Sequence, residues 1–317
     1  MITTITMNPA LDKSTSLEKL IPEKKLRCSE LFQEAGGGGI NVSKAIKKLG
    51  GETLAMFPSG GTNGKLLEKI LTQDKMAFHA IAVTGETRES FTAVERSTNS
   101  QYRFVMPGCS LNEIEMEACF IAIKSLNPIP SIIVASGSLP PGVPDDFYAR
   151  LAIIAKQRNM KLIVDTSGQP LQLAAQEGVY LLKPNLSELC SLVGKENLEL
   201  REVDEAALQV IHKGHCEVVV VSMGPSGALL VTKDIHESIP APTVKKLSTV
   251  GAGDSMVGGM AWMLLQGKPL QDVIRFGVAC GTAATMNAGT KLFNKEDVYR
   301  LYEWINAHSK PQAATMQ

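Results

Sequence analysis

An aspartate directly follows a glycine-rich stretch near the carboxyl end of the chain, in the sequence STVGAGDSM (248–256). An apolar run begins behind Asp254, so the stretch is expected to be a turn that enters a buried helix. The backbone N–H groups of Gly251, Ala252 and Gly253 would then converge where an anion such as a phosphoryl group binds. A carboxylate at this place either caps the helix or takes a proton from a hydroxyl that attacks the phosphoryl group. The stretch alone leaves both interpretations open.

Two better-known phosphate-binding motifs do not fit the chain. A dinucleotide fingerprint, G-x-G-x-x-G, that began at Gly251 would need a third glycine two residues before Gly258. The stretch GGTNGKL (60–66) is one residue short of a Walker A loop, and Leu66 stands where that loop has Ser or Thr. The first mismatch argues against a nucleotide-binding oxidoreductase, and the second against a P-loop enzyme.

Two further turns each have a structural and a functional interpretation. In NLSE (185–188), Asn185 and Glu188 have the spacing of a capping box at a helix start. They also provide the amide and carboxylate oxygens that magnesium prefers. The turn SMGPSG (222–227) needs glycine and proline for its tight geometry alone.

A run of four glycines, GGGGIN (36–41), costs conformational entropy that a purely structural turn does not require. Close approach of a sugar ring to bare backbone at Gly37 and Gly38, with Asn41 behind them, explains the run. Asp12 follows the first strand, at the end of the sheet where α/β proteins bind ligands. Its carboxylate can accept hydrogen bonds from two sugar hydroxyls, and the alternative is a plain turn residue.

Four cations stand in two polar segments of the chain: Lys25, Arg27, Arg88 and Arg103. Lys25 and Arg27 are two residues apart on a stretch that we expect to be extended, so they would project to one face. A sugar phosphate needs several cations, which favours a phosphate site. The alternative is solubilising charge on the edge of a sheet.

Strand-like and helix-like segments alternate along most of the chain. Short apolar strands are predicted at 2–7, 53–57, 131–136, 161–165, 180–184 and 217–222. Helices are predicted at 40–51, 63–74, 145–158, 170–176, 202–214, 253–266, 269–287 and 295–307. Continuous apolar strands divided by helices indicate an α/β fold with a mainly parallel sheet covered on both faces.

Residues 13–35 and 87–106 break this rhythm with the half-exposed alternation of an antiparallel sheet. We expect them to pair into a small β-sheet lid, leaving 1–12, 36–86 and 107–312 as the α/β core. The apolar face of such a lid needs a partner, which favours a homodimer through the lid.

Composition limits the class of function. Hydrophobic residues make up 44% and charged residues 20% of 317, and the formal net charge is zero. This balance disfavours nucleic-acid and membrane-surface roles. None of the six cysteines forms a C-x-x-C pair, no signal peptide precedes the first strand, and no apolar run is long enough to span a membrane. A cytoplasmic location is therefore expected.

Six motifs together closely resemble the ribokinase-like, or PfkB, carbohydrate kinases. STVGAGDSM resembles one signature of that family, and GGGGINVSKAIKKLG (36–50) resembles its N-terminal one. YRFVMPG (102–108), SGSLPPG (136–142), KPNLSEL (183–189) and VSMGPSGAL (221–229) also match in order and spacing. The resemblance covers essentially the whole chain. Within the family it is most similar to the 6-phosphofructokinase branch, with tagatose-6-phosphate kinases and 1-phosphofructokinases as relatives.

This resemblance implies a three-layer α/β/α core with a lid, and ATP-dependent phosphoryl transfer with Asp254 as base. It implies that Asn185 and Glu188 order Mg²⁺ near the ATP phosphates. The implied nucleotide contacts are Lys183, Asn185, Ser222, Gly224, Gly227, Val278 and Thr282. The implied contacts to the sugar phosphate are Asp12, Lys25, Arg27, Gly37, Gly38, Asn41, Arg88, Arg103 and Ser138.

The chain departs from the family pattern at one position. Many members carry Asp where this chain has Ser248, and there it helps to bind a monovalent cation. A potassium site would here combine Ser248 with carbonyl groups of Val250, Ala284, Asn287 and Gly289.

We therefore expect an enzyme that converts fructose 6-phosphate and MgATP to fructose 1,6-bisphosphate and ADP. Tagatose 6-phosphate and fructose 1-phosphate are alternative substrates. A non-catalytic sugar-phosphate sensor on the same fold is a remoter alternative, which the joint presence of Asp254, Asn185 and Glu188 disfavours.

Overall fold

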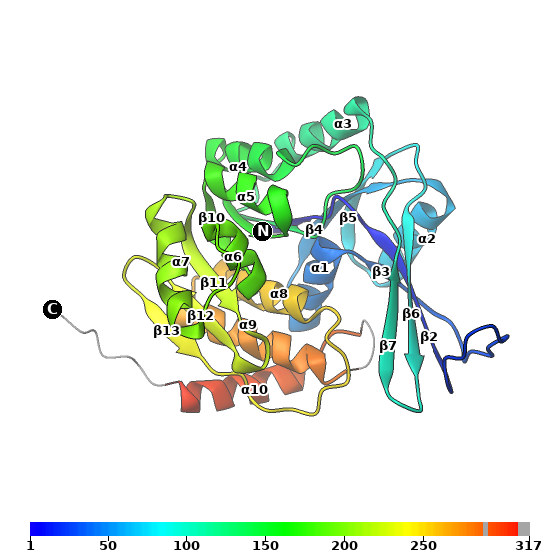
Figure 1. Ribbon diagram of the computed structural model, residues 1–317. Helices are drawn as coiled ribbons and strands as arrows, with labels where there is room; N and C mark the ends of the chain where they lie inside the picture. The colour runs from blue at the N-terminus through cyan, green and yellow to red at the C-terminus, as the bar shows by residue number, and fades with distance from the viewer. Residues whose placement is uncertain (288–290, 310–317) are drawn as a thin grey trace.

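Apolar strands separated by helices form the main sheet of the computed structural model, which describes residues 1–287 and 291–309 (Figure 1). The strands lie in the order β13-β12-β11-β10-β9-β8-β1-β4-β5. Their bounds are β1 Ile2–Ile5, β4 Thr53–Ser59, β5 Ala77–Ala82, β8 Ile132–Ser136, β9 Lys161–Asp165, β10 Val179–Leu182, β11 Cys216–Ser222, β12 Ala228–Val231 and β13 His236–Ile239. All neighbours from β5 to β11 run parallel, whereas β12 and β13 join antiparallel at one edge. The predicted mainly parallel α/β sheet is thus confirmed.

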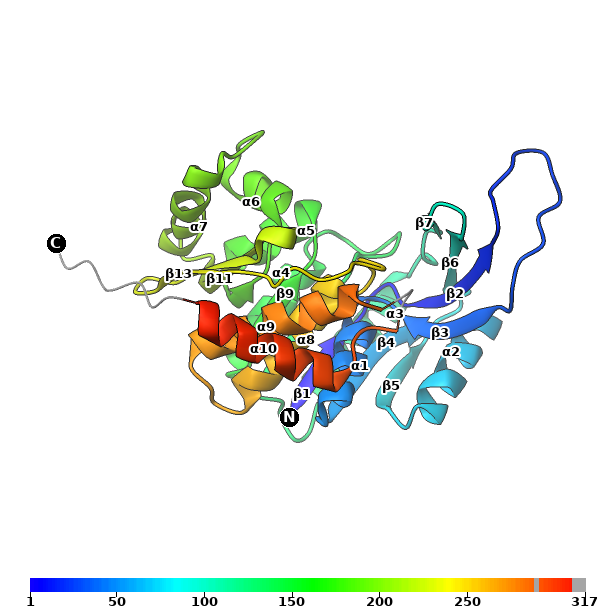
Figure 2. The ribbon, with the colours of Figure 1, turned by 90° about the horizontal axis from the view of Figure 1, so that it is seen from below.

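Helices cover both faces of the main sheet (Figure 2). One face packs against α3 Glu113–Lys124, α4 Phe147–Gln157, α5 Gly168–Glu177, α6 Leu186–Val193 and α7 Val203–His212. The other packs against α1 Gly38–Leu49, α8 Ala252–Leu265, α9 Leu270–Thr285 and α10 Lys295–His308, with α2 Gly61–Gln73 beside α1. Short 3₁₀ turns stand at Leu200–Glu202 and Gly224–Ser226.

Alternation along the strands produces these two buried layers. On β8, Ile133 and Ala135 enter the core beneath α4, whereas Ile132 and Val134 face α8 and α9. Both sets of side chains are buried, because the period of two in a strand sends neighbours to opposite faces. This is why the strands read as unbroken apolar runs in the sequence.

A smaller second sheet stands beside the main one, at the right of Figure 1. It consists of β2 Ala10–Leu17, β3 Phe32–Gly36, β6 Arg88–Glu95 and β7 Ser100–Val105, in the order β3-β2-β6-β7. The expected pairing of the two polar segments is present, but the central pair β2–β6 runs parallel, whereas antiparallel pairing was predicted. Only the outer pairs, β2–β3 and β6–β7, are antiparallel. The difference arises because β2 and β6 both run outward from the same edge of the core, with Ala10 opposite Arg88 and Leu17 opposite Glu95, whereas β3 and β7 run back toward it.

None of the helices in the described part of the chain is both long and apolar enough to cross a membrane. The parallel strands all end at one edge of the main sheet, where open α/β sheets bind ligands. The chain visits strands on opposite sides of β1, with β4 next to it on one side and β8 on the other. A crevice outside such a switch point is the expected position of a site.

Candidate active site

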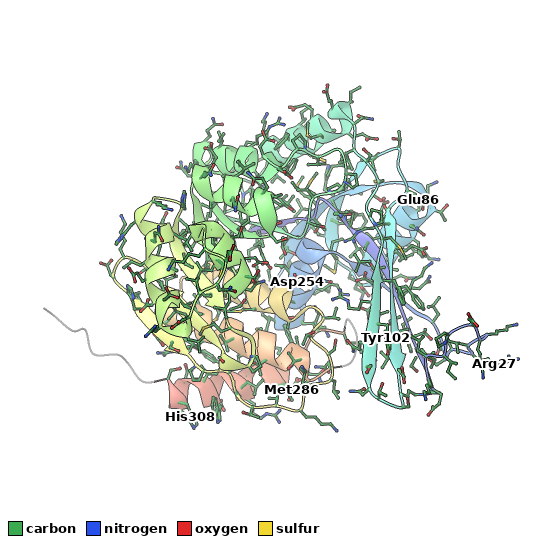
Figure 3. All side chains as sticks on the ribbon, in the orientation of Figure 1. Arg27, Glu86, Tyr102, Asp254, Met286 and His308 are labelled. Carbon is green, nitrogen blue, oxygen red and sulfur yellow. The ribbon has the colours of Figure 1, made fainter. Side chains whose placement is uncertain are left out.

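Asp254 lies in the first turn of α8, next to the carboxyl end of β8 (Figure 3). Its Oδ2 accepts a hydrogen bond from Asn41 Nδ2 at 2.9 Å, and its Oδ1 accepts a longer one from Ser136 Oγ at 3.5 Å. Burial raises the pKa of Asp254 to about 6, and the negative charge of Asp165 adds to the rise. A carboxylate with that pKa is ionised at neutral pH and is still basic enough to accept a proton.

The turn before Asp254 has the geometry that the sequence predicted. Gly251 is the N-cap of α8 and has a φ of 73°, in the left-handed region that favours glycine. There is also little space for a side chain at this residue, since a Cβ there would lie 2.5 Å from Leu292 Cδ2. The N-terminus of α8 therefore stands beside Asp254. The N–H of Ala252 donates to the Thr249 carbonyl at 3.3 Å, and a helix start of this kind can bind an anion.

A buried ion pair lies next to this turn. Lys183 Nζ is 3.1 Å from Asp165 Oδ1, at the ends of β10 and β9. Burial alone would lower the pKa of Lys183, but the Asp165 carboxylate outweighs it and raises that pKa above its ordinary value. A Cβ placed on Gly253 would lie 3.7 Å from Lys183 Nζ, so the ammonium group is close to the turn. The permanent positive charge and the helix end together form an electropositive position suited to phosphate.

Asn185 and Glu188 form the predicted capping box of α6. Asn185 Oδ1 accepts from the N–H of Glu188, and Glu188 Oε2 accepts from the N–H of Asn185, both at 2.9 Å. Burial raises the pKa of Glu188. The second carboxylate oxygen and the amide oxygen are hard donors of the kind that magnesium takes, so these residues fit that metal.

The predicted nucleotide turn lies beside this pair. Ser222 donates its N–H to the Pro184 carbonyl at 2.8 Å, and a β-bridge joins Ser222 to Asn185. The N–H of Gly227 donates to the Gly224 carbonyl at 3.0 Å, and both glycines have positive φ. Two motifs separated in sequence are therefore adjacent in the structure.

The glycine run makes room for neighbouring side chains and backbone. Any Cβ on Gly36 would collide with the Asp12 carboxylate, and one on Gly38 would lie 2.7 Å from the Ser136 carbonyl carbon. The run thus lets α1 start against the ends of β1 and β8. Asn41, expected at the sugar, donates its amide N–H to Asp254, and its Oδ1 is buried without a hydrogen-bond partner among the described residues.

Asp12 and Arg88 meet at the base of the second sheet. Burial raises the pKa of Asp12 to about 6, and the positive charges of Lys44, Arg88 and Arg103 oppose that rise. Arg88 donates to the carbonyls of Met106 and Asn8, each at 3.1 Å, and its Nε is buried without a partner among the described residues. Ser138 lies nearby and accepts a hydrogen bond from the Asn8 side chain at 3.1 Å.

Within one chain, Lys25 and Arg27 do not lie near Asp254. They lie on the long loop 18–31, which contains no strand and projects away from the core (Figures 2 and 3). The sheet pairing expected across residues 13–35 is therefore absent from 18–31, between β2 and β3. Both side chains are exposed, as is Arg103 on β7.

The remaining predicted residues gather around the end of α9. Val278 is buried and Thr282 half-buried on this helix, which packs so closely on α8 that a Cβ on Gly281 would lie 3.2 Å from the Ala252 carbonyl oxygen. The N–H of Ser248 donates to the Thr285 carbonyl at 3.2 Å, which brings the segment of Ser248 and Val250 to Ala284 and Asn287. Gly289 lies outside the described residues.

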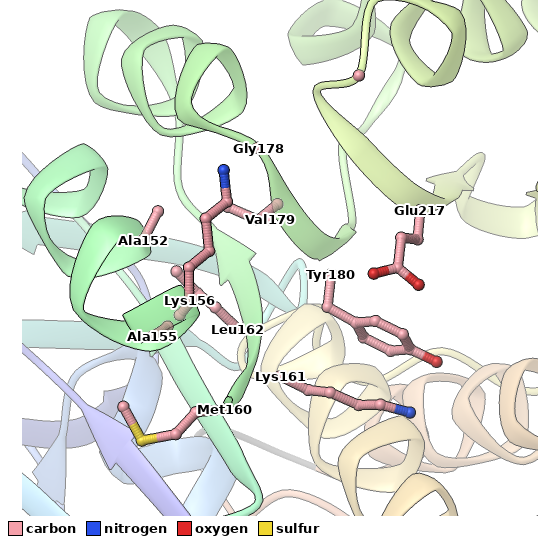
Figure 4. Close-up of a pocket in the computed structure, with 11 residues that line it drawn as sticks. Ala152, Ala155, Lys156, Met160, Lys161, Leu162, Gly178, Val179, Tyr180 and Glu217 are labelled. Atoms are coloured by element: carbon pink, nitrogen blue, oxygen red, sulfur yellow. The ribbon is translucent and has the colours of Figure 1, made fainter. Parts of the chain in front are cut away.

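A separate pocket of about 250 Å³ lies at the opposite edge of the main sheet, where β9, β10 and β11 begin (Figure 4). Lys161 Nζ lies 4.3 Å from the centre of the Tyr180 ring, and Lys156 donates to the Glu177 carbonyl. Glu217 lines the same pocket. Because its lysines already have these partners and it lies far from the Asp254 turn, we do not assign the chemistry to it.

Two residues of the site were not predicted. Ser136 was placed at the end of a strand and at the start of the motif SGSLPPG, without a role of its own, and Asp165 was placed only at the end of a strand. Each is the last residue of a parallel strand, and a polar side chain at that position was an available signal.

A model of the pfkB family of carbohydrate kinases matches residues 3–297. The chain is 43% identical over 302 residues to an ATP-dependent 6-phosphofructokinase isozyme 2 of Mycobacterium tuberculosis, a match that covers 95% of this chain and 89% of the relative. It is 41% identical over 309 residues to the Escherichia coli protein of the same name, covering 96% and 99%. A 1-phosphofructokinase of Xanthomonas campestris is 33% identical and covers 83% of each chain.

Solved structures agree with these similarities. Phosphofructokinase-2 of Escherichia coli in complex with potassium superposes with a TM-score of 0.92 at 40% identity, covering 96% of this chain and 99% of that one. Its complex with fructose-6-phosphate gives 0.90 at 39% identity and the same coverage. A tetrameric inhibited form of that protein also gives 0.90, at 40% identity and the same coverage.

Proposed function

Because the chain belongs to the pfkB family of carbohydrate kinases, we propose that it is an ATP-dependent 6-phosphofructokinase. It transfers the γ-phosphoryl group of ATP to the free primary hydroxyl of fructose 6-phosphate, giving fructose 1,6-bisphosphate and ADP. The observation that carries this proposal is the Asp254 carboxylate, held by Asn41 and Ser136 at the end of α8.

Asp254 acts as the general base. It takes the proton from the sugar hydroxyl as that oxygen bonds to the γ-phosphorus and the bond to the leaving ADP oxygen breaks. The hydrogen bond from Asn41 fixes the direction of the carboxylate, so that one oxygen faces the incoming hydroxyl. A pKa near 6 keeps the group ionised before the reaction.

The N–H groups of Gly251, Ala252 and Gly253 stabilise the charge on the transferring phosphoryl group. Lys183 adds a permanent positive charge next to Gly253. Asn185 and Glu188 hold Mg²⁺, which when bound neutralises charge on the ATP phosphates. Ser222, Gly224, Gly227, Val278 and Thr282 contact the nucleotide.

Asp12, Gly37 and Gly38 contact the sugar hydroxyls, and Arg88, Arg103 and Ser138 contact its phosphate. Two buried atoms, Asn41 Oδ1 and Arg88 Nε, have no hydrogen-bond partner among the described residues, which favours a polar ligand here.

The second sheet is a lid over the sugar. The proposed division has a core of 1–12, 36–86 and 107–312 and a lid of 13–35 and 87–106, although β2 of the second sheet begins at Ala10 and β3 ends at Gly36. Closure excludes water and prevents hydrolysis of ATP. Phe32, Phe104 and Val105 on this sheet, and Leu31 in the loop just before it, are 47–58% exposed. Such an apolar surface supports a homodimer through the lids, in which Lys25 and Arg27 on the projecting loop reach the partner's sugar phosphate.

A potassium site is also proposed, because an Escherichia coli relative was crystallised with that ion. The Ser248 hydroxyl already bonds to Gln101 and to the N–H of Val250, so the carbonyls of this segment, not that hydroxyl, would bind the ion. The six cysteines are free thiols, which supports a cytoplasmic location.

The test is a competition assay with ATP, Mg²⁺ and three sugars: fructose 6-phosphate, tagatose 6-phosphate and fructose 1-phosphate. We expect the highest kcat/KM for fructose 6-phosphate, with the bisphosphate identified as product. Preference for one of the others would replace the substrate, and turnover of none would overturn the proposed function in favour of a sensor.

A further inference from the structure

The second sheet touches the core far from its base, through the side chain of Gln101. Its Nε2 donates to the Leu247 carbonyl oxygen at 3.4 Å, and its Oε1 accepts from Ser248 Oγ at 3.2 Å. Gln101 is the second residue of β7, directly after the turn from β6, so the contact lies at the tip of this hairpin. At the other end of the same hairpin, Arg88 donates to the Asn8 carbonyl at 3.1 Å.

Ser248 lies in the loop that leads into the anion site. The residue is only 3% exposed, and its Oγ also accepts the N–H of Val250 at 3.1 Å. The N–H of Ser248 is bonded to the Thr285 carbonyl, so α9 fixes the opposite side of the loop. The loop then enters Gly251, which starts α8. A displacement of Ser248 therefore reaches the anion site within three residues.

The sheet itself does not require a glutamine at this position. A β-branched or aromatic residue would suit the strand better, whereas the amide supplies one donor and one acceptor to the same loop. Both hydrogen bonds are long, which is common for functional contacts before the substrate has brought the two parts together.

We propose that Gln101 is a positioning residue that fastens the tip of the second sheet to the loop before α8. Closure of this sheet over the sugar then also orders Gly251 to Gly253 for the phosphoryl group. The inference rests on the proposed kinase function. It adds a reason why phosphoryl transfer requires that the sugar phosphate is bound. Gln101 touches neither substrate and acts through Ser248.

The first experiment measures kinase turnover and sugar-independent ATP hydrolysis in Gln101→Ala. We expect kcat for the sugar phosphate to fall about tenfold, as for loss of two net hydrogen bonds. KM for ATP should stay within about twofold. The ratio of ATP hydrolysis to kinase turnover should rise, because water reaches the γ-phosphorus and gives ADP and inorganic phosphate. A merely structural role would lower both rates together with Tm.

Three variants sharpen this test. Thr98→Ala is the matched control, since among the described residues its hydroxyl bonds only to Ser100, and we expect unchanged rates. Gln101→Glu keeps the acceptor for Ser248 but not the donor to Leu247, so it should recover part of kcat. In Gln101→Ala combined with Ser248→Ala, kcat should fall by less than the product of the two single falls, because the two changes share the Ser248–Gln101 hydrogen bond.

Hydrogen exchange of residues 247–254 tests the link independently of activity. We expect faster exchange there in Gln101→Ala and wild-type exchange in Thr98→Ala. A wild-type protein that turns over no sugar phosphate would overturn the proposed function, yet this measurement would still decide the link. Unchanged exchange, or wild-type kcat and hydrolysis ratio in Gln101→Ala, would overturn the inference.

Discussion

The polar groups at the edge of the main sheet and those of the second sheet are held in different ways. Asp254, Asp165 and Lys183 are oriented by each other and by neighbours on the ends of strands and helices. In contrast, Arg103 and Arg27 are exposed on strands or loops that extend from the core. Under the proposed function, the buried groups would perform the chemistry and these exposed arginines would help to recognise the substrate.

The strongest test removes the base from the buried groups. Asp254→Asn should lower kcat by about 10³-fold, because general-base catalysis contributes on that order. The Kd for ATP should hardly change, since the loss concerns the transition state. Asp146→Asn is a matched control on the exposed start of α4, where the carboxylate makes no cap hydrogen bond. A kcat near the wild-type value in Asp254→Asn would leave Asp254 with a structural role only.

A second test concerns the exposed arginines. Arg103→Ala should raise KM for the sugar phosphate by about tenfold to a hundredfold, as expected for one charged hydrogen bond. Its kcat should change less than KM. Arg96→Ala, at the exposed hairpin tip, provides the control. If Arg103→Ala lowered kcat alone, the proposed division between the two regions would be wrong.

The third test uses pH. Because Asp254 must be ionised to accept a proton and its pKa is raised to about 6, kcat/KM should fall below that pH. The fall should be about tenfold per pH unit, and steeper if Asp12, with a similar pKa, must also be ionised. Initial rates from pH 4.5 to 8 measure this limb. A profile that stays level to pH 4.5 would contradict it.

The smallest expected effect is on stability. A carboxyl group whose pKa is higher in the folded than in the unfolded state destabilises the fold once it is ionised. Asp254→Asn should therefore raise Tm at pH 8 by about 2–4 °C. This gain should shrink as the pH falls through about 6 and disappear well below the unfolded-state pKa of 3.8, where the wild-type group is protonated in both states. Calorimetry across this pH range is the measurement, and a lower Tm at pH 8 would argue against burial of the charge.

Much of the core was predictable because its elements are specified locally. The strand at 161–165 has the predicted bounds, since an apolar run between polar ends admits few alternatives. The helix α3 was not predicted, because its own apolar residues are spread around the helix and do not form one face. Ile114 and Ile121, for example, are exposed. The edge strand β13 was also missed, since it alternates over only four residues.

The site was predictable where one motif contains the chemistry and not where distant segments meet. Asp254 could be predicted as a site residue because the glycine turn lies directly before it in the sequence. Its partner Ser136 stands 118 residues away and looks like any strand end until the fold brings them together. The same holds for Gln101 and Ser248, which lie 147 residues apart.

The capping box of α6 has a consequence for how this chain can evolve. Asn185 and Glu188 satisfy each other's backbone N–H groups, so selection for a stable helix would preserve both even without catalysis. Asp254, in contrast, destabilises the fold as a buried charge, and only turnover would keep it. In a descendant that became a sensor, Asp254 should be substituted first. Asn185 and Glu188 would be retained because they stabilise the helix, even where they no longer bind magnesium.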